Sequence, residues 1–308
     1  MESAELELLC RSIRIEHRER MFAMAQRKRA DNALGAFLRR REGWSMKLPE
    51  AEREAIAKRV RAAIKAGEQS AKTGEEQTDP LYLRCEALID AAIEARGPFN
   101  RIENEALLRM KRAVRKLPVW TGWAKDILGI GEASVGTIIG ECGNLNRYPT
   151  HSKLWKRLSL AVMNGRRQGN PGADATKADW MEHKYSKETR SLVWIAGDSF
   201  VKTGGPYRAV YDARKAYELA KAAERGQVVE PASARTKNQP DKFMSAMHIH
   251  RRAQRYAEKK MLRDLHREWT KSSRAIFVLP ERAMDDLPSD ASGVAPMPPH
   301  APFSEAAE

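Results

Sequence analysis

The strongest constraint on the fold of this chain is a glycine turn between two segments of helical periodicity. Residues 128–131 read Leu-Gly-Ile-Gly. Apolar side chains recur at helical spacing both before this turn, in 120–128, and after it, in 135–139. The pattern predicts a helix-hairpin-helix motif.

Such a hairpin can hold a phosphate group. Its glycines permit positive φ and let a phosphate approach the backbone. The N–H groups at the start of the second helix then point at the phosphate, aided by the helix dipole. We expect Gly129 and Gly131 to be the turn glycines, Ile130 to enter the core and Lys125 to add charge. The alternative is a turn that serves packing alone, and we favour phosphate contact.

The segment before the hairpin predicts a helical arm. Residues 4–41 contain one glycine and no proline, with apolar residues at three- and four-residue spacing. Further helices are expected over 49–67 and 79–97, where Gly67 and Gly97-Pro98 are the predicted stops, and over 98–117. We assign 1–118 to a helical arm or linker, with a coiled coil as one option.

The remainder of the chain also favours an all-α fold. Residues 119–225 form the predicted hairpin-containing domain, and 226–240 form a linker. A basic helix is expected over 241–275, and an acidic, proline-rich tail over 283–308 is expected to be disordered. The longest predicted strand is only 275–279.

The charge balance favours a polyanionic partner. The chain has 55 Lys and Arg against 41 Asp and Glu, a formal net charge of +14. Such an excess attracts nucleic acid through counterion release. A basic composition without a binding role is the alternative.

A second group of basic residues follows the hairpin, interleaved with Trp155 and Trp180. This mixture suits phosphate contact with occasional base stacking, although Trp155 is expected to belong to the core. The basic residues are Arg147, Lys153, Lys156, Arg157, Arg166 and Arg167.

Other classes of site find little support in the sequence. The three cysteines are far apart, which argues against a zinc ribbon or a disulfide framework. His248 and His250 are expected on different faces of a helix, and no carboxylate or cysteine stands at ligand spacing near His266. We therefore predict no metal, no cofactor and no catalytic residue. No apolar run approaches membrane-spanning length and the N-terminus is acidic, so we expect a soluble cytoplasmic protein without a signal peptide.

Residues 127–149 resemble the signature PGIGPxxAxxLLAEIGDxxRF of bridge-RNA-guided insertion-sequence transposases of the IS-one-ten type, which includes the Piv-like invertases. Residues 184–214, which end in a Pro-Tyr-Arg-Ala-Val-Tyr segment, resemble the helix pair that follows in that family. Residues 18–44 look like its helical linker. The resemblance extends over roughly 4–269.

The resemblance implies a DNA-binding transposase domain. In that family an RNase-H-like domain supplies four acidic magnesium ligands, and a serine after the hairpin is the nucleophile. The resemblance starts at the family's linker, after the acidic domain, and the stretch 161–176 that corresponds to the serine loop contains no serine. Ser159 falls where the family has a glycine, and Ser186 falls on the next helix. No catalytic residue carries over.

Three functions remain open. The favoured one is a DNA-binding derivative of such a transposase, without catalysis of its own, associated with the nucleoid and paired as a homodimer through its N-terminal helix. Structured RNA is the alternative ligand. The second is a recombinase subunit that acts with a separate catalytic chain, and the third is a helical scaffold of a mobile-element complex.

Overall fold

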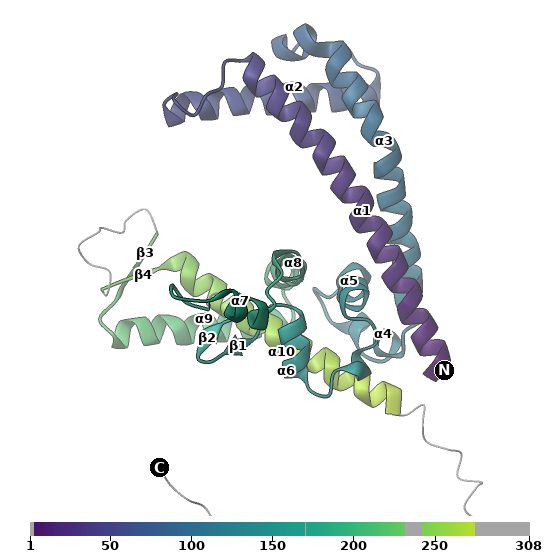
Figure 1. Ribbon diagram of the computed structural model, residues 1–308, viewed down its shortest axis with the longest axis vertical. Helices are drawn as coiled ribbons and strands as arrows, with labels where there is room; N and C mark the ends of the chain where they lie inside the picture. The colour runs from purple at the N-terminus through teal and green to yellow at the C-terminus, as the bar shows by residue number, and fades with distance from the viewer. Residues whose placement is uncertain (1–2, 170, 232–241, 275–308) are drawn as a thin grey trace, which may run out of the picture. The chain divides into compact units, whose positions relative to one another are not determined.

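The fold is described by a computed structural model that covers residues 3–169, 171–231 and 242–274. This part of the chain is predominantly helical (Figure 1), which confirms the predicted all-α class. Its strands are two or three residues long and form two-stranded pairs: β1 with β2 antiparallel, and β3 with β4 parallel. The predicted tail over 283–308, the predicted strand over 275–279 and much of the predicted linker lie outside the described residues.

The arm is built from three helices: α1 (Ser3–Arg41), α2 (Glu50–Thr73) and α3 (Pro80–Val114). Helices α1 and α3 lie side by side in Figure 1. Ion pairs join Arg109 to Glu16 and Arg96 to Asp31, so the two helices run antiparallel. The apolar stripe of α1 is therefore covered within the same chain.

Gly67 does not end α2, as the sequence predicted, but lies buried inside it. A Cβ built at Gly67 would stand 2.6 Å from Ile89 and 2.9 Å from Ile93 of α3. The missing side chain thus lets the two helices approach closely. The helix ends instead at Gly74, whose φ of 70° and N–H bond to Ser70 close the last turn.

The predicted helix boundary at Gly97-Pro98 is also wrong, because α3 continues through both residues. An interior proline costs about 3 kcal/mol, since it removes a backbone hydrogen bond. The helix nevertheless continues, and one residue before Gly97, Arg96 forms ion pairs with both Asp31 of α1 and Glu68 of α2.

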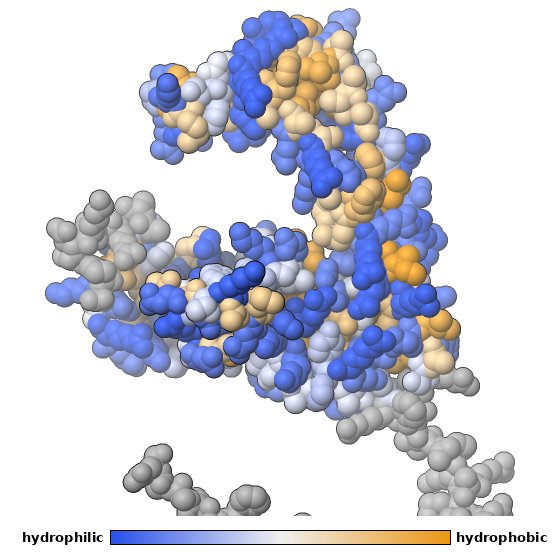
Figure 2. All heavy atoms as spheres, in the orientation of Figure 1, coloured by the Kyte–Doolittle hydropathy of each residue, from blue (hydrophilic) through white to orange (hydrophobic). Residues whose placement is uncertain are grey.

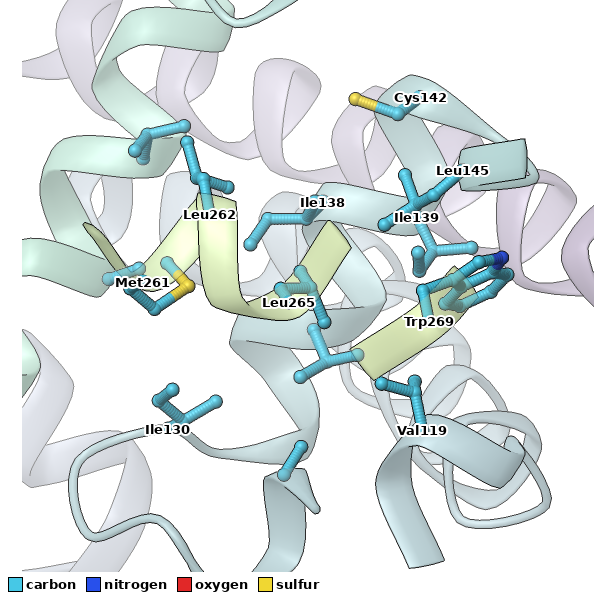
Figure 3. Close-up of a cluster of buried hydrophobic side chains, with 14 of the residues drawn as sticks. Val119, Ile130, Ile138, Ile139, Cys142, Leu145, Met261, Leu262, Leu265 and Trp269 are labelled. Carbon is cyan, nitrogen blue, oxygen red and sulfur yellow. The ribbon is translucent and has the colours of Figure 1, made fainter. Parts of the chain in front are cut away.

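The larger of two hydrophobic clusters joins the arm to the helical domain. Ile13 of α1 and Met110 of α3 belong to it, together with α5 (Glu132–Cys142) and α10 (Ala246–Arg274). Figure 3 shows Leu265 and Trp269 of α10 directed toward α5. The predicted basic helix over 241–275 thus begins at Ala246 and places its apolar face in this core.

The smaller cluster lies where α1, α2 and α3 meet. Leu38, Val60, Tyr82 and Ile89 are its best-buried large side chains. It shares no buried residue with the larger cluster, so the chain has two centres of packing connected by α1 and α3.

Further helices and short strands complete the domain. They are α4 (Pro118–Gly122), η1 (Ala124–Asp126), η2 (Leu145–Arg147), α6 (His151–Arg157), β1 (Val162–Met163), β2 (Arg166–Arg167), α7 (Lys177–His183), α8 (Lys187–Thr203), α9 (Pro206–Glu224), β3 (Val228–Glu230) and β4 (Phe243–Ser245). None of the helices in the described ranges is both long enough and apolar enough to cross a bilayer.

Candidate nucleic-acid interface

The glycine turn stands between the short elements α4 and η1 and the longer helix α5. Gly129 has a φ of 91°, and a Cβ built there would lie 2.7 Å from the Phe200 Cα of α8. Gly131 has an ordinary φ of −98° and open space around it, so the expectation of positive φ at both glycines is wrong for Gly131. Ile130 is 7% exposed and belongs to the larger cluster, as predicted. Gly129 is thus required by packing against α8.

The N-terminus of α5, where a phosphate was expected, carries a carboxylate of the chain itself. Glu132 is the first residue of α5 and forms an ion pair with Arg115 at 3.0 Å. Partial burial works to raise the pKa of Glu132, but the hydrogen bond from Arg115, a backbone hydrogen bond and the charges of Arg115 and Lys111 together outweigh it, and the pKa lies below its ordinary value. A fixed negative charge therefore already stabilises this helix end. Lys125 is exposed nearby in the chain.

Four of the predicted basic residues come together in a hollow of about 380 Å³, which we call the lysine hollow. Its lining consists of Arg147, Tyr148, Pro149, Lys153, Lys156, Arg157 and Lys184. Lys184 was not predicted from the sequence, and no acidic residue lines the hollow.

The lysine hollow and the glycine turn lie at opposite ends of α5. Arg157 donates hydrogen bonds to the Glu141 carbonyl, and Tyr148 donates to the Cys142 carbonyl, both in the last turn of that helix. An 11-residue helix is about 16 Å long at 1.5 Å per residue. The structure thus separates the two halves of the predicted site.

The cations of the lysine hollow differ in their availability. Arg147 is paired with Glu7, and Arg157 lies 3.5 Å from the Glu141 carboxylate. Lys153, Lys156 and Lys184 form no ion pair with any residue that the structure describes. Three ammonium groups at this surface therefore have no internal counter-charge.

Gln168 holds the backbone on which two of these lysines stand. Its buried amide nitrogen donates to the carbonyl oxygens of Lys156 at 2.9 Å, His183 at 2.7 Å and Lys184 at 3.3 Å. Its amide oxygen accepts from Ala161 N–H at 3.1 Å. One side chain thereby joins the end of α6 to the end of α7.

The other predicted basic residues lie outside the lysine hollow. Arg166 and Arg167 form strand β2 and are exposed. Arg166 donates a hydrogen bond to the Pro171 carbonyl, so part of its donor capacity is used within the loop.

Trp155 and Trp180 have different environments. Trp155 packs against the larger cluster and donates its indole N–H to the Lys259 carbonyl, as expected of a core residue. Trp180 is 49% exposed. Of these two tryptophans, Trp180 is therefore the one open to a stacking partner.

Ser159 is fully buried and has a φ of 61°. Its hydroxyl oxygen accepts a hydrogen bond from Ser186 N–H at 2.9 Å and lies 3.3 Å from the Thr189 hydroxyl. Left-handed backbone is the conformation that glycine adopts without strain and that a residue with a side chain rarely adopts. The Ser159 hydroxyl is a structural group and not an accessible nucleophile.

The histidines of α10 are directed to separate partners. His250 shares a hydrogen bond with the Tyr211 hydroxyl at 2.8 Å, and His266 contacts the Tyr148 carbonyl at 2.8 Å. Within the described ranges, no group of three or more His, Cys, Asp or Glu side chains could hold a metal ion.

Comparisons with protein-family models, with curated proteins and with solved structures each found no match to this chain.

Proposed function

We propose that this chain binds nucleic acid, with DNA as the favoured ligand, through the lysine hollow. The observation that carries the proposal is the convergence of five cations on one hollow without an acidic residue in its lining. The sequence resemblance to insertion-sequence transposases supports DNA over RNA, and it makes a nucleoid-associated role in the cytoplasm part of the proposal.

The physical basis is counterion release. Each ammonium group that meets a phosphate releases about one condensed cation. For duplex DNA, the binding constant therefore falls by about 0.9 log units per contact for each tenfold rise in salt concentration. Lys153, Lys156 and Lys184 can contribute fully, because no ion pair within the described structure has to break first.

The test is a triple variant, Lys153→Gln, Lys156→Gln and Lys184→Gln, titrated against duplex and branched DNA at several salt concentrations. The slope of log affinity against log salt should become shallower by about 2 to 3, because three phosphate contacts are lost. Affinity should fall for all DNA sequences alike, since phosphate contacts carry no sequence information.

The matched control removes the same charge from the exposed side of α2, with Lys58→Gln, Lys65→Gln and Lys72→Gln. This variant should retain the slope apart from a small change due to net charge. Equal slopes for the two triple variants, or wild-type affinity that is indifferent to salt, would contradict the proposal.

The recombinase-subunit function gains no support from Ser159, whose hydroxyl is enclosed. Strand exchange by this chain would therefore need a nucleophile other than Ser159. We keep nucleic-acid binding as the single proposed function.

We also propose that two copies of this chain pair as a homodimer through α1. The side of α1 that faces α3 is covered, but Leu8, Ile15 and Phe22 are exposed at seven-residue spacing. Figure 2 shows apolar patches over the α1–α3 pair. A seven-residue repeat is typical of a helix seam. Sedimentation should give a dimer mass that Ile15→Glu reduces to the monomer mass; a monomer at all concentrations would contradict the pairing.

A further inference from the structure

A second hollow, of about 400 Å³, lies between α1 and the turn that follows α5. We call it the arginine hollow. Four arginines contribute to its lining, which consists of Glu7, Cys10, Arg11, Arg14, Ile15, Arg18, Gly143 and Arg147. The sequence predicted only Arg147 as a binding residue, and the other three arginines lie in the predicted helical arm.

The backbone at Gly143 permits Arg14 to approach. Gly143 has a φ of 72°, and a Cβ built there would lie 3.0 Å from an Arg14 guanidinium nitrogen. A larger residue would therefore strain the backbone and displace Arg14. The turn after α5 is thus shaped to admit a guanidinium group.

The charge of the arginine hollow is strongly positive. Glu7 is the only acidic residue in its lining; its carboxylate accepts hydrogen bonds from Arg147 and, at 3.2 Å, from Asn144. Burial, with the nearby Glu7 charge, raises the pKa of Cys10 to about 12, so the thiol adds no negative charge. Four guanidinium groups and one carboxylate leave a net charge of three positive units.

The chemistry of guanidinium selects the ligand class. Its planar donors match the oxygens of a phosphate in pairs, and it sheds water more readily than ammonium does. Arg147 also lines the lysine hollow, so the two hollows adjoin at one residue. A polyanion bound in the lysine hollow would therefore meet the arginines next.

We infer that the arginine hollow binds a phosphate group of a nucleic-acid strand that continues from the lysine hollow onto α1. This inference rests on the proposed function for the source of the phosphate, but the hollow itself is an independent anion site. A free phosphate compound is the other source of the same chemistry, and a second copy of the chain is a competing occupant because Ile15 belongs to both surfaces.

The test uses Arg11→Gln, Arg14→Gln and Arg18→Gln together, in the full chain, with Arg147 left intact. DNA of increasing length is titrated against salt. For long DNA the slope should become shallower by about 2 to 3, whereas the shortest oligonucleotides that bind should show little change. The control, Lys28→Gln with Arg40→Gln and Arg41→Gln, removes three exposed charges from the same helix and should keep the wild-type slope.

A calorimetric titration with pyrophosphate gives a second arm that does not depend on DNA. Binding that the arginine variant loses and the control retains supports the anion site. If long-DNA slopes are unchanged as well, the phosphate comes from a small molecule and the strand path is overturned.

Three further outcomes are decisive. If neither pyrophosphate nor DNA distinguishes the arginine variant from its control, the inference is overturned while the lysine-hollow test stands on its own. If wild-type protein binds no DNA, the proposed function fails and pyrophosphate alone decides about the hollow. In the last outcome, the wild type sediments as a dimer and the arginine variant as a monomer, and this dissociation accounts for the whole change in the salt slope. The arginines then serve self-association, and the inference is overturned.

Discussion

The two glycines of the turn at 128–131 have different physical roles, and substitution should separate them. Gly129→Ala should destabilise the fold by more than about 2 kcal/mol, because the backbone is left-handed and the new Cβ meets Phe200. Gly131→Ser should be neutral or slightly stabilising, since Gly131 has ordinary φ, open space and the N-cap position of α5. Chemical denaturation of both variants measures the difference, and equal stabilities would contradict the packing role of Gly129.

A buried carboxylate on α10 should make stability depend on pH. Glu258 is fully buried, with its oxygen 2.9 Å from an Arg190 guanidinium nitrogen. Burial raises the pKa of Glu258 from 4.5 to about 7, against the lowering effect of Arg190 and Arg255. Between about pH 4.5 and pH 7, Glu258 thus retains a proton in the folded chain and releases it in the unfolded chain.

The corresponding contribution to stability is complete below about pH 4.5 and is lost as pH rises through 7, amounting to about 3 kcal/mol. Glu258→Gln should therefore flatten the curve of unfolding free energy against pH between these values. Parallel curves for the variant and the wild type would show that Glu258 titrates normally.

At the scale of single residues, the sequence predicted local burial better than contacts with distant parts of the chain. It placed Ile130 in the core correctly, because an apolar residue between turn glycines has few other positions. It assigned Gly129 to phosphate access, whereas the space beside that glycine is filled by Phe200, a contact 71 residues along the chain that no local pattern reveals.

Within the helices, two glycines of the arm offer a matched pair. Gly67→Ala should destabilise by about 1 to 3 kcal/mol, because the added methyl group would meet Ile89 and Ile93. Gly97→Ala should change the free energy of unfolding by less than about 1 kcal/mol, because the open space around Gly97 favours the methyl group whereas Pro98 disfavours a Cβ on the residue before it in a helix. Thermal unfolding of the two variants checks the difference.

Helix starts were predictable where the signal is local. The Asp79-Pro80 pair begins α3 as expected, and the Asp79 carboxylate accepts hydrogen bonds from the N–H groups of Leu81 and Tyr82 at 3.0 and 2.9 Å. The stop at Gly97-Pro98 failed because tertiary packing decides whether a helix tolerates a weak point. Helix propensities of single residues contain no information about an ion pair between two helices, such as that of Arg96 with Asp31.

For the molecule as a whole, two separate hydrophobic clusters imply unequal local stability. Leu38→Ala in the smaller cluster should cost about 2 to 5 kcal/mol and accelerate amide hydrogen exchange in α2 and the adjoining half of α3. Exchange in α5 and α10 should remain slow, because their side chains belong to the larger cluster. Uniform acceleration throughout the chain would show that the two clusters unfold as one unit.

The candidate interface was only partly predictable at this scale. Arg147, Lys153, Lys156 and Arg157 are close in sequence, so their proximity follows from a short turn and one helix. Lys184 comes from a different element. It is the C-cap of α7, with a φ of 45°, and this end of α7 lies at the same hollow. The three arginines of α1 come from the other end of the chain, and only the packing of α1 against the turn after α5 places them there.

Gln168 fixes the backbone positions from which two lysines of the lysine hollow extend. Because one neutral amide joins the carbonyls of Lys156 and Lys184, the distance between two cation-bearing backbones is set before any ligand arrives. The flexible side chains of the two lysines can still move, but the points from which they extend stay in place. Under the proposed function, a buried side chain that carries no charge would thus limit the region that the two positive charges can reach.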